Sequence, residues 1–341
     1  MQPYLDLTDA DHALWLADHQ LPLYRQKQIL EGVFQKRAHT FEAISNLPAP
    51  IRKQLDKDFC LRQTRVILKE KSQLDGTVRY TFEASDGERF TAVALPAKER
   101  LALCLSTQVG CAYACQFCAT GLMKLQRNLL ASEILDQIFW IEEDRKQKAT
   151  SILFMGMGEP LANYNAVVHA VRWITSPDGL GMSPHRIVLS TSGVVPGIER
   201  LTRDRVKVDL AISLHATTDA LRVQLLPVSG HFPIRGLLKA VQEYSSAMDV
   251  PVTFEFILLR DVNDSPAEAR RLVKLAHLTH AKVNLIAYNP VKGLPYQTPT
   301  EEAVENFQKI LRDAKVPVFL RRPRGRDIDA GCGQLGEATL S

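Results

Sequence analysis

The sequence predicts an α/β protein: a partial TIM-type (β/α) barrel, preceded by a small N-terminal helical accessory domain and a short connecting β-sheet. Three observations lead to this prediction. Apolar runs of strand length alternate with amphipathic stretches from about residue 100 onward. Residues 64–96 contain strand-like runs separated by Asp-Gly turns, and residues 1–60 show helical periodicity.

The N-terminal domain is expected to span residues 1–62. In YRQKQILEGVFQKR, the pairs Ile29/Val33 and Leu30/Phe34 have the i,i+4 spacing of one helix face. Residues 25–71 also carry eleven basic side chains against five acidic ones. This excess fits either a surface that faces phosphates or an ordinary solvated helix face.

The connecting segment is expected to span residues 63–96. TRVILKEK and TVRYTFEA flank the turn at Asp75-Gly76, and RFTAVALP follows a second pair, Asp86-Gly87. Asp-Gly between alternating runs is a strong hairpin signal, because a tight hairpin turn needs a residue that tolerates positive φ. The segment therefore predicts a small antiparallel sheet.

The barrel is expected to span residues 97–341. Its predicted strands are LALCLST, ILFM, RIVLS, VDLAIS, VTFEFIL, VNLIAY and VPVFLR. In parallel β/α folds the functional face lies at the C-terminal ends of the strands, so the residues after these runs are the candidates for chemistry.

Two helices between these strands can be placed from the sequence. Residues 132–145 put Ile134, Ile138 and Ile141 on a single helix face. Residues 299–312 predict another helix. Its expected start is a capping box of Thr298 and Glu301, with Pro299 at the first helical position.

The composition excludes several classes of protein. The 341 residues are 45% hydrophobic and 23% charged, which suits a globular protein with a large core. The acidic start MQPYLDLTDADH lacks the apolar region of a secretory signal, and no apolar stretch approaches the ~18 residues of a membrane span. We therefore expect a cytoplasmic protein without membrane contact. The net charge of +4 does not by itself indicate nucleic-acid binding.

The most informative motif is C-x3-C-x2-C, formed by Cys111, Cys115 and Cys118 in GCAYACQFCATG. Three thiolates can hold a 4Fe-4S cluster by three of its irons and leave the fourth iron open to another ligand. A zinc knuckle is the alternative. It needs a fourth Cys or His nearby, and none follows within thirty residues of Cys118.

A second motif, GMGEP, follows the strand-like run ILFM and spans Gly156 to Pro160. Glycines at the end of a strand let the backbone approach a ligand closely. Glu159 could accept a hydrogen bond from an amino group or a ribose hydroxyl.

Together these motifs resemble those of the radical S-adenosylmethionine (SAM) enzymes, in which a three-cysteine cluster motif precedes a glycine-rich SAM motif. The resemblance narrows to the RlmN/Cfr family of RNA adenine methyltransferases and covers nearly the whole chain. The matching segments, in family order, are QVGCAYACQFCATG, FMGMGEPLANY, STSGVVPGI, AISLHA, VNDSPAEA, NLIAYNPV and RGRDIDAGCGQL.

The resemblance implies a radical SAM core in the barrel, with a 4Fe-4S cluster and SAM as cofactors. It implies RNA as substrate (rRNA, tRNA or both), an electron donor such as flavodoxin or ferredoxin, and a monomer. The implied SAM contacts are Gly158, Glu159, Ser190, Ser213, Leu214, His215 and Asn289. By itself, His215 would fit a hydrogen-bonded histidine at a strand end better than a ligand contact.

The resemblance also gives roles to two further cysteines. Cys332, in IDAGCGQLG, is implied to carry the methyl group as S-methylcysteine; a buried core cysteine fits poorly between two glycines. Cys104 is implied to form a transient disulfide with Cys332, although its apolar strand alone would favour a packed core cysteine. Cys60 matches no motif and is expected to be structural.

The implied reaction is methylation of carbon 2 of adenine in large-subunit rRNA and tRNA. One SAM methylates Cys332. A second SAM yields a 5′-deoxyadenosyl radical, which takes a hydrogen atom from that methyl group. The carbon radical adds to adenine, and after loss of an electron and a proton Cys104 releases the product by attacking the sulfur of Cys332, which leaves a disulfide. Arg321, Arg322, Arg324 and Arg326 could bind RNA phosphates, or form a solvated surface.

Two alternatives stay open: methylation of carbon 8, and a non-catalytic iron–sulfur protein that binds RNA. The presence of both Cys104 and Cys332 disfavours the second, because binding needs neither thiol. The chain also departs from the family pattern. Thr91 stands where members usually carry a glutamate as proton acceptor, thirteen residues before Cys104, and Gly331 stands where they tend to have alanine. Glu88 is the nearest carboxylate, and its offset predicts the other face of a strand.

Overall fold

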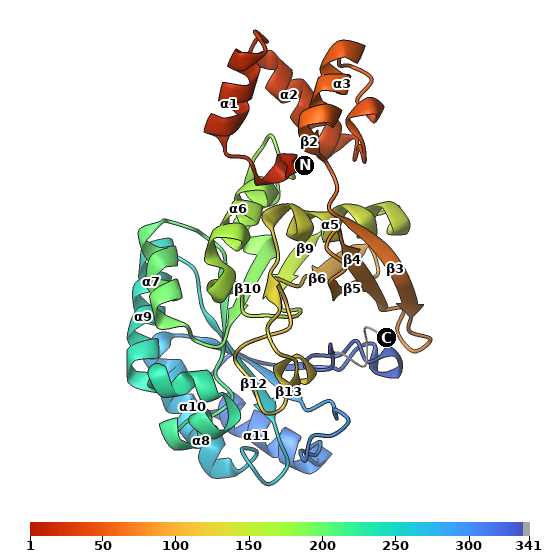
Figure 1. Ribbon diagram of the computed structural model, residues 1–341. Helices are drawn as coiled ribbons and strands as arrows, with labels where there is room; N and C mark the ends of the chain where they lie inside the picture. Colours follow the sequence, from red (N-terminus) through yellow and green to blue (C-terminus); the bar gives the residue numbers. More distant parts are fainter. Residues whose placement is uncertain (337–341) are drawn as a thin grey trace.

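A ten-stranded sheet forms the centre of the computed structural model, which describes residues 1–336 (Figure 1). Its order is β14-β13-β12-β11-β10-β9-β6-β5-β4-β3. The parallel strands are β6 (Arg100–Cys104), β9 (Ser151–Phe154), β10 (Ile187–Thr191), β11 (Asp209–Ser213), β12 (Thr253–Leu258), β13 (Lys282–Ala287) and β14 (Val318–Arg321). They coincide with the seven apolar runs, so the prediction of a parallel barrel core is confirmed.

The antiparallel strands continue this sheet and do not form one of their own. They are β3 (Thr64–Lys71), β4 (Val78–Ala84) and β5 (Arg89–Ala97), and β5 pairs with β6. Both predicted turns are present, with Gly76 at φ 74° and Gly87 at φ 86°. Because β3 and β14 are the two edges of the sheet, the barrel is open between them.

Successive side chains along the parallel strands point alternately into the hydrophobic core and toward the pockets. Leu103, Leu189, Ile212, Phe254 and Leu285 are at most 1% exposed and pack into the hydrophobic core. Their neighbours point to the opposite face of the sheet, as the pleat requires. The residues placed there are Cys104, Ser190, Ser213, Glu255 and Ile286, and all of them line pockets.

Helices connect the parallel strands and cover the outside of the sheet (Figure 1). They are α5 (Ala131–Arg145), α6 (Tyr164–Thr175), α7 (Val195–Arg203), α8 (Asp219–Leu225), α9 (Ile234–Met248), α10 (Pro266–Thr279) and α11 (Glu301–Asp313). Ile134, Ile138 and Ile141 are fully buried, as predicted for α5. No helix in residues 1–336 combines the length and the apolar character needed to cross a membrane.

The start of α11 differs from the prediction. Thr300, not Thr298, is the N-cap, and its hydroxyl oxygen accepts from the Ala303 amide at 3.2 Å. The Thr298 hydroxyl instead donates to the Tyr288 carbonyl at 3.0 Å. This bond fixes Thr298 in the preceding loop, so the helix begins two residues later than the proline suggested.

The N-terminal helices lie beside α5 and α6, at one end of the sheet (Figure 1). They are α1 (Asp9–Asp18), α2 (Tyr24–Leu30) and α3 (Ala49–Asp58), and β1 (Gln2–Pro3) pairs with β2 (Phe59–Cys60). The paired residues Ile29/Val33 and Leu30/Phe34 are all buried, as their spacing predicts. The division into domains at residues 62 and 96 stays a prediction. The last five residues of the predicted barrel domain, 337–341, lie outside the part of the chain that the structure describes.

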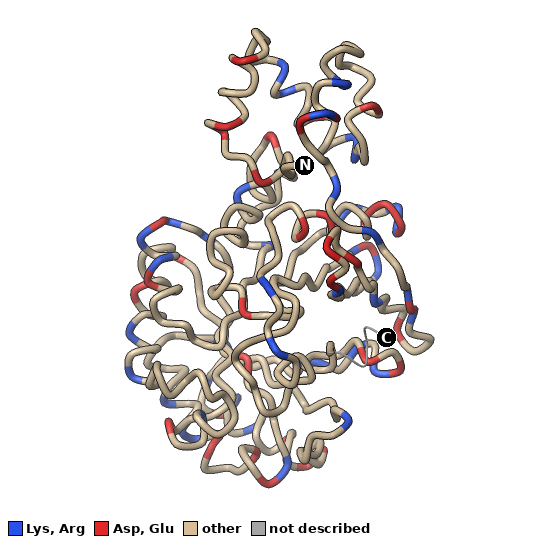
Figure 2. Tube along the Cα trace, in the orientation of Figure 1, with Lys and Arg blue, Asp and Glu red and all other residues tan. Residues whose placement is uncertain are grey.

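Much of the N-terminal basic excess is neutralised within the protein. Six of the eleven basic side chains have a carboxylate partner: Lys36, Arg37, Arg52, Arg62, Arg65 and Lys69. Three of these partners, Asp136, Glu142 and Asp144, belong to α5. Figure 2 accordingly shows basic and acidic residues interspersed over these helices. The basic excess therefore serves in part to dock the N-terminal segment onto α5.

Candidate active site

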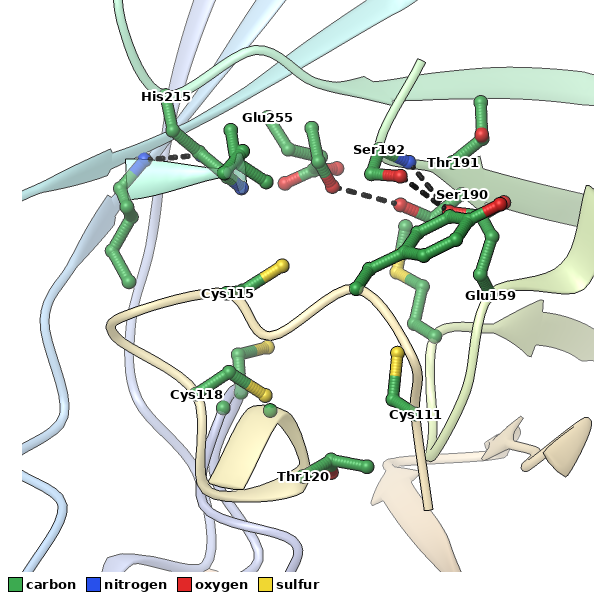
Figure 3. A pocket seen from close by; sticks show the side chains of 18 of the residues that line it. Cys111, Cys115, Cys118, Thr120, Glu159, Ser190, Thr191, Ser192, His215 and Glu255 are labelled. Carbon is green, nitrogen blue, oxygen red and sulfur yellow. Dashed lines mark hydrogen bonds between the residues drawn. The ribbon is translucent and has the colours of Figure 1, made fainter. Parts of the chain in front are cut away.

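A pocket lies on the inner side of the parallel strands, and three cysteines form one wall of it. Cys111, Cys115 and Cys118 come from the loop between β7 (Gln108–Val109) and α4 (Ala119–Leu122), and their thiols face one common space (Figure 3). Two backbone bonds shape this loop: the Cys118 amide donates to the Cys115 carbonyl at 3.2 Å, and the Gln116 amide to the Leu225 carbonyl at 3.0 Å.

The chemistry of these thiols fits an iron–sulfur cluster. Burial raises the pKa of Cys111 to about 12 and also raises the pKa of Cys115 and Cys118. Nearby positive charge is needed to stabilise the thiolate forms, and ligated iron supplies it.

The GMGEP turn brings Glu159 to the opposite wall. Gly158 has φ 97°, and a Cβ there would lie 2.5 Å from the Gln108 Cβ, so only glycine fits. The Glu159 carboxylate accepts from the Ser192 amide at 2.7 Å and from the Ser192 hydroxyl at 2.8 Å, and also from the Leu161 amide at 3.0 Å (Figure 3). The carboxylate that the sequence suggested as a free acceptor is thus already partly hydrogen-bonded.

Three other predicted contacts also line this pocket. Ser190 and Ser213 face each other across β10 and β11, with hydroxyl oxygens 3.4 Å apart. His215 accepts from the Ile257 amide through Nδ1 at 3.1 Å, and burial lowers the pKa of its ring to about 3. The His215 ring is therefore neutral. It is hydrogen-bonded at the end of a strand, as a structural histidine would be, and it also lines the pocket, as a ligand contact would.

Leu214 and Asn289 lie elsewhere. The Leu214 side chain is fully buried in the hydrophobic core, and its amide donates to the Glu255 carbonyl at 3.1 Å. Asn289 belongs to a second, adjoining pocket, where its Nδ2 donates to the Cys332 carbonyl at 3.3 Å. The structure thus brings five of the seven predicted SAM contacts to the cysteine pocket.

The second pocket contains both remaining candidate cysteines. Cys104 ends β6 beside Val93 of β5, and Cys332 lies in the loop that follows β14. Cys332 lines both pockets, whereas Cys104 lines only the second. Burial raises the pKa of Cys104 to about 12, and the charges of Cys332 and Arg321 change it further in opposite directions. Two thiols separated by more than 200 residues therefore share one cavity.

The four arginines near Cys332 do not form one surface. The Arg324 guanidinium donates to two backbone carbonyls, at 2.9 Å to Asp75 and at 2.7 Å to Pro96. Arg321 lines both pockets, 3.6 Å from Glu255. Arg322 and Arg326 are exposed. Arg326 Nε donates to Asn289 Oδ1 at 3.3 Å, so Arg326 is anchored on one side and exposed on the other.

Sequence reasoning missed Glu255 on β12. It is 4% exposed and lines the cysteine pocket. Its Oε1 accepts from Asn284 at 2.8 Å, while Oε2 has no hydrogen bond and lies 3.6 Å from Arg321. The signal was present in TFEFIL, where a glutamate interrupts an otherwise apolar strand.

The structure also shows the surroundings of the residues at which this chain departs from the family pattern. Thr91 is fully buried, its hydroxyl lies 3.5 Å from the Met157 sulfur, and it lines neither pocket. Glu88 precedes β5 in the turn, so strand alternation does not decide its direction, contrary to the sequence argument. Gly331 lies against Gln334 and Asn289, and a Cβ there would be 2.6 Å from the Gln334 Oε1.

Comparisons with known proteins agree with this site. A model of the radical SAM superfamily matches residues 105–273. The dual-specificity RNA methyltransferase RlmN of Syntrophobacter fumaroxidans is 42% identical over 92% of this chain and 91% of its own length. The RlmN of Geotalea uraniireducens is 40% identical over 92% and 90%. A solved radical SAM methyltransferase from Sphaerobacter thermophilus has 37% identity and a TM-score of 0.93, covering 98% of this chain and 99% of its own.

Proposed function

This chain belongs to the RlmN family of radical SAM RNA methyltransferases, and from that premise we propose that it methylates carbon 2 of adenine in large-subunit rRNA and tRNA. The observation that carries the proposal is the position of Cys332, which lines both the cysteine pocket and the pocket of Cys104. A methyl carrier must meet a methyl donor and an acceptor in turn, and this position offers access to both.

The cofactors are a 4Fe-4S cluster and SAM, as in the rest of the superfamily. Cys111, Cys115 and Cys118 would hold the cluster, and Gly158, Glu159, Ser190, Ser213 and His215 would surround SAM. When bound, the cluster supplies the electron that cleaves SAM and gives a 5′-deoxyadenosyl radical. The apolar and hydrogen-bonded walls of the pocket would keep water from that species.

The two other cysteines divide the remaining chemistry. The Cys332 thiol would accept a methyl group, and after removal of a hydrogen atom the carbon would bond to adenine in the second pocket. The adduct would then lose an electron and a proton. Cys104 then attacks the sulfur of Cys332, so the methylated base leaves and a disulfide remains. A protein that merely bound RNA would need neither thiol in a shared cavity.

The RNA must present its base away from a helical stack, because both pockets lie inside the barrel. Arg322 and Arg326 would bind phosphates at the rim, since both are exposed, whereas Arg321 and Arg324 are partly buried. We further propose that the enzyme acts as a cytoplasmic monomer that receives electrons from a donor such as flavodoxin or ferredoxin.

Mass spectrometry of rRNA and tRNA nucleosides tests this function. We expect 2-methyladenosine in cells that carry the gene and its loss when the gene carries Cys332→Ala, because the methyl carrier is gone. Cys60→Ala is the matched control, and we expect it to keep the wild-type level. Finding 8-methyladenosine instead would show that the enzyme methylates carbon 8 of adenine. An unchanged level of 2-methyladenosine in Cys332→Ala would refute the role of Cys332 as methyl carrier.

A further inference from the structure

The segment that carries Cys332 is attached to the hairpin turn between β3 and β4. The Arg324 guanidinium spans the carbonyls of Asp75 and Pro96, and the Asp75 carboxylate accepts from the Gly325 amide at 2.9 Å. Asp327 accepts from the Gln73 amide at 2.8 Å. These contacts lie five to eight residues ahead of Cys332. We name this set of contacts the hairpin clamp.

A second attachment lies just after Cys332. The Ala119 amide donates to the Gly333 carbonyl at 2.7 Å, and the Thr120 hydroxyl donates to the Leu335 carbonyl. Ala119 directly follows Cys118, so this attachment ties the loop to the cluster-binding segment. Cys332 is therefore held between two anchors that come from distant parts of the chain.

The hairpin clamp crosses the open side of the barrel. The sheet is unpaired between β14 and β3, and residues 322–329 run from the end of β14 to the β3–β4 turn (Figure 1). Both β14 and the hairpin are paired to neighbouring strands without the clamp. The clamp thus fixes residues 322–329, which follow β14 and lead into the loop that carries Cys332. The position of this segment sets the position of Cys332.

We propose that Asp75 and Arg324 are positioning residues, which hold Cys332 where it can serve both pockets. The inference rests on the proposed function, because only a methyl carrier must be placed relative to two pockets at once. A displacement on the order of 1 Å can cost a reaction about a hundredfold. Loss of the clamp should therefore uncouple SAM cleavage from methyl transfer, while SAM cleavage itself continues.

The experiment compares Arg324→Met with Arg65→Met in the reconstituted holoenzyme. Arg65 pairs with Glu83 at the other end of the same hairpin and, unlike Arg324, lines neither pocket, so it controls for the loss of an arginine ion pair on the sheet. We expect the ratio of 5′-deoxyadenosine to methylated adenine to rise about tenfold or more in Arg324→Met. Arg65→Met should keep the wild-type ratio. Arg324→Lys should fall between, because the lysine ammonium keeps the donors but lies one bond closer to the backbone than Nη2, the nitrogen that donates to both carbonyls.

A second readout does not depend on turnover. Mild oxidation of the wild-type protein should form the Cys104–Cys332 disulfide, which mass spectrometry quantifies without reduction. We expect slower formation in Arg324→Met and an unchanged rate in Arg65→Met. If the wild type makes no methylated adenine, the proposed function fails, and this rate still tests the clamp.

Wild-type values of both readouts in Arg324→Met would overturn the inference. If Arg324→Met does not fold, Asp327→Ala takes its place, because it removes the contacts of this carboxylate with the Ser72 side chain and the Gln73 amide and leaves Arg324 intact. It should shift both readouts in the same direction by a smaller factor, and unchanged readouts would count equally against the clamp.

Discussion

The two pockets of this enzyme are built in different ways. The cysteine pocket rests on the ends of parallel strands, where Ser190 and Ser213 follow the pleat of β10 and β11. The second pocket lies between strand residues and the loop around Cys332, which contacts the β3–β4 turn and the cluster segment. Strands line both pockets, but the second has a larger share of residues from this loop, whose position depends on a few contacts between distant segments.

This difference separates two parts of the reaction. Radical generation needs a fixed frame around the cluster and SAM, and the strand ends would supply it if SAM binds as proposed. Methyl transfer needs a carrier that faces two pockets in succession, and a loop held at both ends can provide this position. Damage to either pocket should therefore produce a distinct kinetic defect.

The largest effect should come from Cys104→Ala, which changes only the second pocket. Cys104 would release the product, so without it turnover should stop after methyl transfer to RNA. We expect a covalent complex between protein and RNA on a denaturing gel, while 5′-deoxyadenosine still forms once per enzyme. Cys60→Ala is again the control and should give no adduct. Free methylated RNA from Cys104→Ala would show that Cys104 is not needed to release the product.

Gly158→Ala should damage the cysteine pocket alone. An alanine at φ 97° is strained, and its Cβ would meet the Gln108 side chain. Such strain costs on the order of 1–3 kcal/mol, which corresponds to about a 5- to 150-fold loss of SAM affinity if the turn relaxes. Equilibrium binding of SAM measures this loss. Gly236→Ala is the matched control, because α9 has open space at that position, and it should bind SAM normally.

Much of the fold was predictable because local sequence determines it. Each strand of the parallel sheet is a short apolar run, and the two Asp-Gly pairs mark the hairpin turns. The prediction was wrong at the start of α11, where a tertiary hydrogen bond from Thr298 to Tyr288 replaced a local cap. Whether the antiparallel strands form their own sheet also depends on pairing between β5 and β6, which no local pattern encodes.

The site divides in the same way. The three cluster cysteines and Gly158 belong to short motifs whose spacing reflects their geometry. The environment of Glu255 depends on Asn284 and Arg321 in later strands, so its sequence shows only an unusual charge in an apolar run. The different fates of Arg322 and Arg324 are also set by distant partners, since only Arg324 reaches the carbonyls of Asp75 and Pro96. The sequence alone therefore does not distinguish these four arginines from one another.

A pH profile provides the mildest test of the difference between the pockets. Release by Cys104 requires its thiolate, and burial raises the pKa of this thiol to about 12. Below that pKa the thiolate fraction grows about tenfold with each pH unit, so the release step should accelerate as pH rises from about 7 to 9. SAM cleavage should change far less over this range, because the neutral His215, whose pKa is about 3, does not titrate there.

Single-turnover measurements can separate the two steps, with rapid quenching to follow decay of the protein–RNA adduct and formation of 5′-deoxyadenosine in the same samples. A release rate that stays flat over this range would show that another group deprotonates Cys104 before the slow step. In that case Glu255, whose Oε2 has no hydrogen bond and lies 3.6 Å from Arg321, a residue that lines both pockets, would be the first residue to replace, and Glu255→Gln should restore the pH dependence.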